Sequence, residues 1–446
     1  MIILHISTRL ILGGSQENTV LSCEGQARRG HRVHLAFGPI YGPEGSLLQR
    51  VAAFNQRCRA GLERTTEGAP AAPILTHVIP DLVRQIAPRR DLRARYQIMR
   101  LVRAIAPEIV HTHSSKAGIL GRAAAWSVYR GAPRARPAVL HTIHGPPFMP
   151  VEGGPLRRLK IRAANAVYAV VERRAARQCH RIISVADAMT RQFLARGIGT
   201  PGLYTTVHSG MEIAPFITPA PNESRAETRR VLGLAEDAVV VVTVARLAQH
   251  KGHDDLLAAL PVDELRAAGI ALLWVGDGWW RGRLIEHARA LGYVVRELDR
   301  AGTPGTNPAP VDAARADLVL TGLVPPERIP ALLRASDILA HPSAREGLPR
   351  TVPQALLAGI PPVAYDADGT REACIDGVTG RLVAVGDSAG LQRALLELAA
   401  DPARRAALAA RGHAMCLERF DARVMVGALE GAYAEALRRA DAARSV

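Results

Sequence analysis

The stretch HPSAREGLPRTVPQALLAGIPPVAYDADG, residues 341–369, contains one unit of the fold together with a candidate binding group. The apolar run DILAH from Asp337 leads into it and PVAYD from Pro362 closes it, so the pattern predicts strand, helix, strand. Between the strands, Glu346 and Gly347 stand in the turn that leads into the helix. Ligands of open α/β sheets bind at the carboxyl ends of strands, which is where this turn is expected.

The same alternation of short apolar runs and longer helical segments extends over the whole chain. Its 446 residues fit two domains of about 200 residues each. The pattern predicts an α/β fold with two doubly wound parallel sheets. Expected strands begin at Ile2, Arg32, Glu108, Ala138 and Arg181, and then at Val239, Ala271, Asp317, Asp337 and Pro362.

The domain boundaries follow from composition. Residues 1–208 form the expected N-terminal domain, and the Pro-rich, helix-poor stretch 209–224 suits a linker. Ser224, followed three residues later by Glu227, forms a capping box that starts a helix of the second domain, residues 225–420. An apolar-periodic stretch then predicts a closing helix over 421–446, expected to cross back to the first domain.

Two segments break the alternation of strands and helices. Residues 38–75 are rich in Gly, Pro and Arg and are expected to be an irregular insertion. Residues 299–316 combine Pro, Gly and Asn and are expected to be a surface loop.

Cysteine use and hydropathy favour a cytoplasmic protein. No apolar run approaches the roughly 18 residues of a membrane span, and the start MIILHIS enters a strand without a basic leader. The five cysteines are far apart and form no C-x-x-C pair, so we expect reduced thiols, with buried core cysteines a compatible reading.

The positive charge is confined to one half of the chain. Net charge is +16, yet residues 1–200 carry 30 Arg and Lys against 11 Asp and Glu, whereas the remainder is slightly acidic. This favours an anionic partner for the first half, such as a phosphorylated lipid, a membrane surface or nucleic acid. Only 3 of the basic residues are Lys, so an Arg-rich composition is the alternative. With 4% aromatic residues and no recognition motif, we expect no nucleic-acid partner.

The stretch PLRRLKIRAANAVYAVVERRAARQCHR from Pro155 combines basic residues with an apolar face. Such a helix can lie on an anionic membrane surface. A solvated helix face is the alternative.

Two loops carry candidate anion-binding groups. Arg246 and Lys251 follow the apolar strand VVVVTVA, where two cations can hold a diphosphate and stabilise it as a leaving group. A solvated pair without a role is the alternative. Gly13 and Gly14 precede a helix whose free N–H groups can meet an anion or a sugar, although a plain tight turn has the same residues.

Four histidines lie at two expected strand ends: His111, His113, His141 and His144. Their spacing is not HExxH and no acidic ligand adjoins them, so we expect no metal. His144, before Gly145, is the best placed to hydrogen-bond a ligand, and structural roles are the main alternative for the other three.

Glu346 can accept hydrogen bonds from sugar hydroxyls and stabilise positive charge at an anomeric carbon. A helix N-terminal Glu that gains only ~0.3–1 kcal/mol from the macrodipole is the alternative.

Together these motifs resemble the retaining glycosyltransferases of family four, which have the GT-B fold. The resemblance covers nearly the whole chain and rests on GGSQE near Gly13, HTHSSKAGILGRAAA from His111, HTIHGPPF from His141, VHSGMEIAPF from Val207, ARLAQHKG from Ala245, and the run from Glu346. It implies two Rossmann-like domains that face a cleft, the first binding the acceptor and the second the nucleotide-sugar donor. It also implies a hexosyl transfer with retention of configuration and without a metal or other cofactor.

The resemblance implies a role for each candidate residue. Gly14, in the Gly13 loop, would close on the donor diphosphate, and Arg246 and Lys251 would grip it. His144 would face the donor sugar, and Glu346, beside Gly347, would bind the sugar hydroxyls.

Gln354 stands where the E-x7-E signature of the family has its second Glu, which binds the ribose. An amide replaces one accepting oxygen by a donor, which lowers nucleotide affinity by about 1–3 kcal/mol without removing the chemistry.

The motifs resemble transferases of cell-surface polysaccharide assembly. They imply a UDP-sugar as the donor, with a GDP-sugar as the alternative, and a glycan or polyprenyl-diphosphate-linked acceptor. With the basic first half, they predict a cytoplasmic enzyme that associates peripherally with the inner membrane face. A GT-B nucleotide-sugar 2-epimerase, or a non-catalytic nucleotide-sugar-binding protein because of Gln354, are the alternatives.

Overall fold

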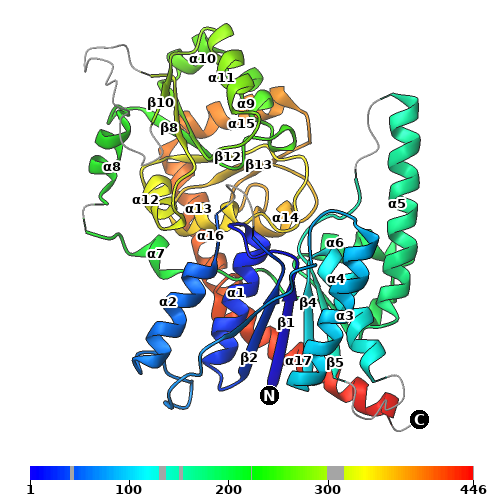
Figure 1. The fold of residues 1–446 in the computed structure, drawn as a ribbon. Helices are drawn as coiled ribbons and strands as arrows, with labels where there is room; N and C mark the ends of the chain where they lie inside the picture. The colour runs from blue at the N-terminus through cyan, green and yellow to red at the C-terminus, as the bar shows by residue number, and fades with distance from the viewer. Residues whose placement is uncertain (41–44, 130–136, 150–153, 222, 299–315, 445–446) are drawn as a thin grey trace. The chain divides into compact units, whose positions relative to one another are not determined.

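A computed structural model describes residues 1–446 except 41–44, 130–136, 150–153, 222, 299–315 and 445–446 (Figure 1). The chain forms two compact units. Unit 1 comprises Met1–Met211 together with Ala422–Val446, and unit 2 comprises Glu212–Asp421. The stretch 209–224, expected as a linker, spans the change from one unit to the other.

Unit 1 is built on a seven-stranded parallel sheet of order β3-β2-β1-β4-β5-β6-β7. This is the order of a doubly wound sheet, with the reversal between β1 and β4. Its strands are β1 (Ile2–Ser7), β2 (Arg32–Phe37), β3 (Leu75–Val78), β4 (Ile109–His113), β5 (Ala138–Ile143), β6 (Arg181–Ser184) and β7 (Tyr204–Thr206). Its helices are α1 (Gly14–Ala27), α2 (Leu48–Arg59), α3 (Pro88–Ile105), α4 (Ser115–Val128), α5 (Pro155–Ala176), α6 (Asp187–Leu194) and α17 (Ala422–Arg444), with a 3-10 turn, η2 (Pro201–Leu203).

Helices cover both faces of this sheet because neighbouring residues of a strand point to opposite sides. Leu4 and Ile6 of β1 share a core with α3 and α4. Ile3 belongs to a second core with Tyr433 and other residues of α17. The last helix therefore completes unit 1, and it packs so closely on α1 that a Cβ on Gly25 would lie 2.4 Å from Val426.

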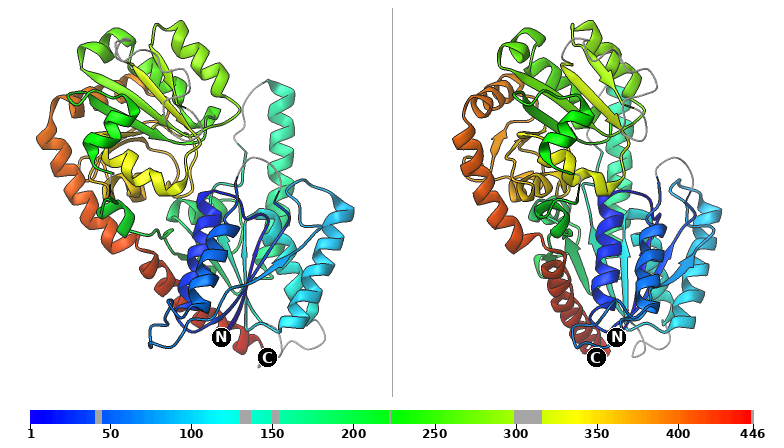
Figure 2. Two further views of the ribbon diagram at one scale, coloured as in Figure 1. Left: turned by 60° about the vertical axis from the view of Figure 1, so that its left-hand side comes forward. Right: turned by 90° about the vertical axis from the view of Figure 1, so that its left-hand side faces the viewer.

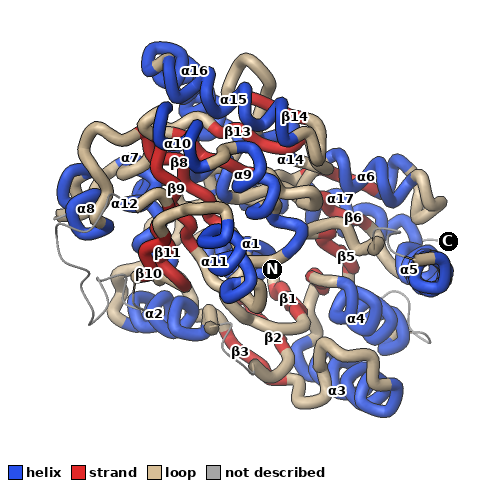
Figure 3. Tube along the Cα trace, turned by 90° about the horizontal axis from the view of Figure 1, so that it is seen from above, coloured by secondary structure: helices blue, strands red, loops and turns tan. Residues whose placement is uncertain are grey.

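Unit 2 repeats this architecture with strand order β10-β11-β9-β8-β12-β13-β14, again all parallel, and helices lie on both sides of the sheet (Figures 2 and 3). Helices α9, α11 and α15 share one continuous core with the strands. The strands are β8 (Val239–Val244), β9 (Ile270–Val275), β10 (Val295–Glu297), β11 (Leu318–Gly322), β12 (Ile338–His341), β13 (Pro362–Tyr365) and β14 (Arg381–Val383). The helices are α7 (Ala214–Ile217), α8 (Arg225–Leu232), α9 (His253–Ala259), α10 (Val262–Ala267), α11 (Arg281–Ala290), α12 (Ile329–Arg334), α13 (Thr351–Leu357), α14 (Thr370–Ala373), α15 (Ser388–Ala400) and α16 (Pro402–Arg419), with 3-10 turns η3 (Gln249–Lys251) and η4 (Pro326–Arg328).

The fold confirms two doubly wound parallel sheets, and every expected strand is present within a residue or two. The Ser224 side chain accepts a hydrogen bond from the backbone N–H of Glu227, as the capping box predicts. Gly233 ends α8 in the left-handed conformation, with φ 65°. The four strands that the sequence did not indicate are short and lie at or beside sheet edges: β3, β7, β10 and β14.

The expectation of an irregular insertion over residues 38–75 was wrong. Helix α2 lies within it and buries Val51, Phe54 and Cys58, which are spaced three and four residues apart on one face. The segment is helical because packing of this narrow apolar stripe against the domain stabilises the helix, although the rest of the segment is polar. The linker also contains a short helix, α7, whose Phe216 is buried. Except for Ala316, the expected loop 299–316 lies outside the described residues.

None of the helices in the described part of the chain is long and apolar enough to cross a membrane. All five cysteines are free and buried.

Candidate functional site

The candidate groups of unit 2 gather where the strand order of its sheet reverses. Strands β8 and β12 are neighbours there. The strand that follows β8 in the chain, β9, lies on one side of this pair, and the strand that follows β12, β13, lies on the other. Arg246 and Lys251 follow β8, and Glu346 follows β12, so the three side chains emerge from the carboxyl ends of adjacent strands. This reversal is the place where doubly wound sheets bind ligands.

Backbone contacts hold these two loops together. The carbonyl oxygen of His250 accepts hydrogen bonds from the Ala344 N–H at 2.9 Å and the Ser343 hydroxyl at 3.2 Å. Gly252 has φ 69°, and a Cβ there would lie 2.0 Å from the carbonyl oxygen of Pro342. Only glycine permits this approach, which brings the Lys251 turn against the Glu346 turn.

Lys251 and Glu346 form an ion pair, with Nζ 2.5 Å from Oε1. Nε2 of His341, the last residue of β12, lies 3.1 Å from the same oxygen. The Lys251 and Glu346 side chains are only 18% and 13% exposed. Burial favours the neutral carboxyl, but the charge of Lys251 and the nearby His341 outweigh it and hold the pKa of Glu346 well below its usual value. The carboxylate is therefore ionised at neutral pH.

The Glu346 turn is fixed from a third strand. The backbone N–H of Glu346 donates to Asp368 Oδ2 at 2.9 Å, and Asp368 has φ 47°, a left-handed conformation that is uncommon outside glycine. Gly347 is buried beside Glu346, and Gln354 lies half-buried on α13. Sequence reasoning missed Asp368 because its partner comes 22 residues earlier and shares no local pattern with it.

Arg246 is exposed, and its guanidinium carbon lies 5.6 Å from the ring centroid of Trp279. Trp279 follows β9, the neighbour of β8, and is 73% exposed. A cation over an indole face gains about 0.5–1 kcal/mol at such a site. The indole therefore orients the guanidinium without covering it.

Unit 1 has its own reversal point, between β1 and β4. Helix α1 begins at Gly14, with Gly13 as its N-cap, and both glycines are exposed. The first N–H groups of a helix have no partner within the helix and favour an anion. The loops after β1 and β4 are joined by the Thr8 and Ser114 hydroxyls, whose oxygens lie 2.7 Å apart.

His144 lies half-buried directly after β5, whereas His111, His113 and His141 are fully buried within strands. Apart from His141, the structure joins them to residues that sequence reasoning missed: His5, Gln26 and Tyr433. His5 faces His111 in the register of β1 and β4. The alternation of neighbouring strands could have indicated it, but no spacing along the chain does.

His5, His111 and His113 are also the described residues whose side-chain nitrogens could hold a metal, lying within 4.8 Å of one another. Each of these nitrogens already has a hydrogen-bond partner, namely Gln26, Tyr433, Thr142, His144 or another ring of the set. The arrangement therefore fits a hydrogen-bonded network better than a metal centre.

Two family models match the chain. Residues 13–210 match the glycosyl transferase 4-like domain, and residues 238–401 match the glycosyl transferases group 1. The first range lies within unit 1 and the second within unit 2.

Curated relatives are glycosyltransferases. The chain is 26% identical over 325 residues to the UDP-Gal:alpha-D-GlcNAc-diphosphoundecaprenol alpha-1,3-galactosyltransferase of Escherichia coli, covering 72% of this chain and 74% of that enzyme. It is 29% identical over 246 residues to a GDP-mannose-dependent alpha-(1-6)-phosphatidylinositol monomannoside mannosyltransferase of Mycolicibacterium smegmatis, covering 54% of this chain and 58% of that enzyme.

Solved structures share the fold over nearly the full length. The Anabaena protein HepE, in complex with UDP and glucose, has a TM-score of 0.70 at 19% identity, covering 97% of this chain and 99% of that one. Sucrose-phosphate synthase from Thermosynechococcus elongatus has a TM-score of 0.71 at 17% identity and covers 98% of each chain. With both halves matched by the family models, this chain belongs to the family-four glycosyltransferases, which have the GT-B fold.

Proposed function

We propose that this protein transfers a hexosyl group from a UDP-sugar to a glycan or polyprenyl-diphosphate-linked acceptor, with retention of anomeric configuration. The observation that carries the proposal is the pairing of Lys251 with Glu346 at the reversal point of the second sheet, where Arg246 also follows β8. Two cations and one ionised carboxylate at that point suit a diphosphate and the sugar attached to it.

Each group then has one task in the transfer. Arg246 and Lys251 bind the diphosphate and stabilise the charge that it gains as the bond from its oxygen to the anomeric carbon breaks. Glu346 accepts hydrogen bonds from sugar hydroxyls and stabilises positive charge at that carbon. The acceptor hydroxyl attacks from the face that the diphosphate leaves, and its proton passes to the departing diphosphate. The family resemblance assigns the backbone N–H groups at Gly13 and Gly14 to the diphosphate and His144 to the donor sugar.

The donor and acceptor classes are supported by relatives. The Escherichia coli relative is named for UDP-Gal and a diphosphoundecaprenol-linked sugar, and HepE was solved with UDP and with UDP-glucose. The mycolicibacterial relative uses GDP-mannose, so a guanosine donor belongs in the same test.

The test begins with thermal unfolding of the purified chain in the presence of UDP-glucose, UDP-galactose, UDP-N-acetylglucosamine and GDP-mannose. The true donor should raise the unfolding temperature most, because its sugar adds contacts with the folded state to those of the shared nucleotide. Release of UDP that depends on polyprenyl-diphosphate-linked N-acetylglucosamine, or on a free glycan acceptor, then supports transfer. Free epimerised nucleotide sugar supports an epimerase instead, and binding without any product supports a non-catalytic protein.

Membrane association forms part of the proposal and rests on α5, which extends beyond the sheet of unit 1 (Figures 1 and 2). Its apolar residues recur every three or four positions along one side of the helix, which is the spacing of a single stripe. Leu156, Leu159, Val167 and Val170 of this stripe are 76%, 65%, 64% and 60% exposed. The side that packs on the domain, which includes Glu172, lies opposite. The apolar face of α5 is thus its outer face.

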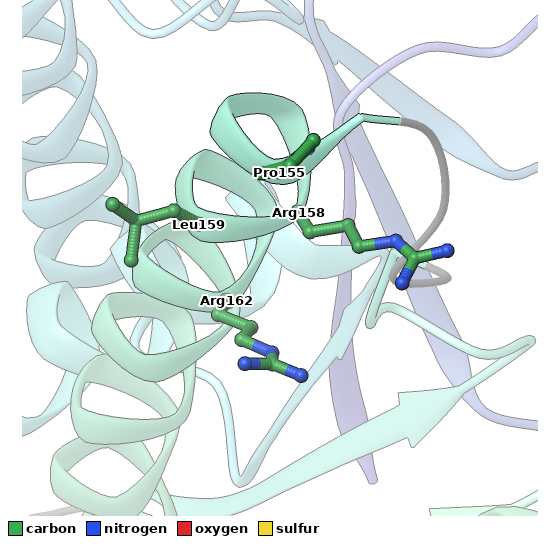
Figure 4. A pocket seen from close by; sticks show the side chains of 4 residues that line it. All are labelled: Pro155, Arg158, Leu159 and Arg162. Atoms are coloured by element: carbon green, nitrogen blue, oxygen red, sulfur yellow. The ribbon is translucent and has the colours of Figure 1, made fainter.

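The first turns of α5 also carry basic groups beside the stripe. A hollow there is lined by Pro155, Arg158, Leu159 and Arg162, and the two guanidinium groups extend to the same side (Figure 4). Apolar insertion flanked by cations suits an anionic bilayer surface, where each Arg contributes about 1 kcal/mol. On this proposal the enzyme is cytoplasmic and docks on the inner face of the membrane that holds its acceptor.

A further inference from the structure

His5 of β1, His113 of β4 and His144, directly after β5, form a hydrogen-bonded row inside unit 1. Nδ1 of His5 lies 2.9 Å from Nε2 of His113, and Nδ1 of His113 lies 3.0 Å from Nε2 of His144. The rings are stacked, with interplanar angles of 16° and 29°. Each contact joins the Nδ1 of one ring to the Nε2 of the next, so both hydrogen bonds have the same orientation along the row from His5 to His144.

Gln26 of α1 fixes the buried end of this row. Its Oε1 lies 2.7 Å from Nε2 of His5, and its Nε2 donates to the Tyr433 hydroxyl at 2.9 Å. The Tyr433 oxygen lies 2.7 Å from Nδ1 of His111. With the amide oxygen toward His5, the Nε2 of His5 must carry the proton, because an amide oxygen only accepts.

The proton on His5 determines all the others. Burial lowers the pKa of His5 to about 4 and holds the pKa of His113 well below its usual value, so both rings are neutral at pH 7 and carry one proton each. His5 then accepts at Nδ1 from His113 Nε2–H, and His113 accepts at Nδ1 from His144 Nε2–H. A reversed amide would invert every one of these tautomers.

We propose that Gln26, His5 and His113 are positioning residues that hold His144 in its Nε2–H tautomer. In this tautomer Nδ1 is the ring nitrogen of His144 that can accept a hydrogen bond. The inference rests on the proposed function and deepens it, because the family resemblance assigns His144 to the donor sugar. An acceptor nitrogen favours a hydroxyl of a neutral hexose over the carboxylate of a hexuronic acid, which brings only further acceptors.

The test is imidazole ¹⁵N NMR of the full chain without substrate, with His144 assigned by its loss in His144→Gln. The expected result is a protonated Nε2 and an unprotonated Nδ1 on His144. In Gln26→Leu, which removes the anchor, the two tautomers should mix. In Gln26→Glu, whose carboxylate also accepts from His5, the Nε2–H form of His5 should persist. Tyr433→Phe, which releases the amide and also removes the hydroxyl beside His111, serves if Gln26→Leu does not fold.

Two outcomes overturn the inference: Nδ1–H on His144 in the parent chain, or stoichiometric metal that persists through dialysis and binds His5, His111 and His113. The NMR experiment needs no turnover, so it reports the tautomers of these histidines even if the proposed function is wrong. In an active enzyme, Gln26→Leu should lower kcat about tenfold with KM for the nucleotide sugar within about twofold. UDP-glucose should also exceed UDP-glucuronate in kcat/KM, and the reverse order contradicts the acceptor assignment.

Discussion

Nζ of Lys251 lies 2.5 Å from Oε1 of Glu346, so a cation assigned to the diphosphate and a carboxylate assigned to the sugar neutralise each other across two adjacent strands. The pair is mostly buried, and its neutralisation lowers the cost of holding either charge there. A diphosphate bound to Lys251 would interact with the same ammonium group as Glu346. The Glu346 carboxylate would remain available to the sugar.

Lys251→Met and Glu346→Gln should therefore separate binding from chemistry. Lys251→Met should weaken UDP binding by about 1.5–3 kcal/mol, the range of a charge-assisted hydrogen bond. Glu346→Gln should change UDP affinity by less than about threefold but lower kcat by about 10²–10³. Calorimetry with UDP and steady-state kinetics measure the two effects. Equal losses of UDP affinity in both variants would contradict the division of roles.

The ion pair should also make stability depend on pH. The folded-state pKa of Glu346 lies below its ordinary value of 4.5, so the unfolded chain binds the proton more readily. The stabilisation is present above that value and is lost as pH falls toward the folded pKa. The gap in free energy of unfolding between the parent chain and Lys251→Met should thus shrink between pH 6 and the lowest pH at which both remain folded. Urea unfolding at several pH values measures it, and a gap that widens in acid would refute the pair's contribution.

Gln354→Glu should tighten UDP binding, because a carboxylate accepts two hydrogen bonds from the ribose where the amide accepts through one atom. The expected gain is about 1–3 kcal/mol. The matched control is 2′-deoxy-UDP, for which the gain should be smaller. If both nucleotides gain equally, residue 354 acts through charge rather than through the ribose. Turnover that appears only in Gln354→Glu would favour a non-catalytic parent protein.

Gly252→Ala should disrupt the approach of the two site loops. Its Cβ would lie 2.0 Å from the Pro342 carbonyl oxygen, whereas Gly269, with a similar φ of 64°, has nothing within 4 Å of the same position. Gly269→Ala should cost only the left-handed strain, about 1–2 kcal/mol, and leave UDP affinity unchanged. Gly252→Ala should cost more and also weaken UDP binding. Thermal unfolding and calorimetry on both variants test this, and equal behaviour would refute the close approach.

Replacing the outer face of α5 should release the protein from anionic membranes. Leu159→Ser with Val167→Ser removes apolar insertion, and Arg158→Ala with Arg162→Ala removes about 2 kcal/mol of attraction to the surface, roughly thirtyfold in partitioning. Leu62→Ser is the control, since Leu62 is 73% exposed but lies outside α5. Sedimentation with phosphatidylglycerol vesicles, compared with phosphatidylcholine vesicles at low salt, measures binding. If the parent chain binds neither kind of vesicle, the membrane proposal is wrong.

The sequence predicted the central strands because they are short runs rich in β-branched and other apolar residues, such as VVVVTV in β8, and are largely buried. It missed β10 and β14, which have three residues each and are only partly buried. It missed α2 because Val51, Phe54 and Cys58 are a sparse stripe among polar residues, and only contact with neighbouring elements makes the segment a helix.

The sequence by itself determined the family and the residue types of the site, because Arg246, Lys251 and Glu346 each follow a recognisable apolar strand. Only the tertiary structure decided which of them touch. The pairing of Lys251 with Glu346 joins residues 95 positions apart through the contact of β8 with β12. The row from Gln26 and His5 to His144 likewise depends on strand order, since parallel strands bring together residues that no spacing along the chain relates.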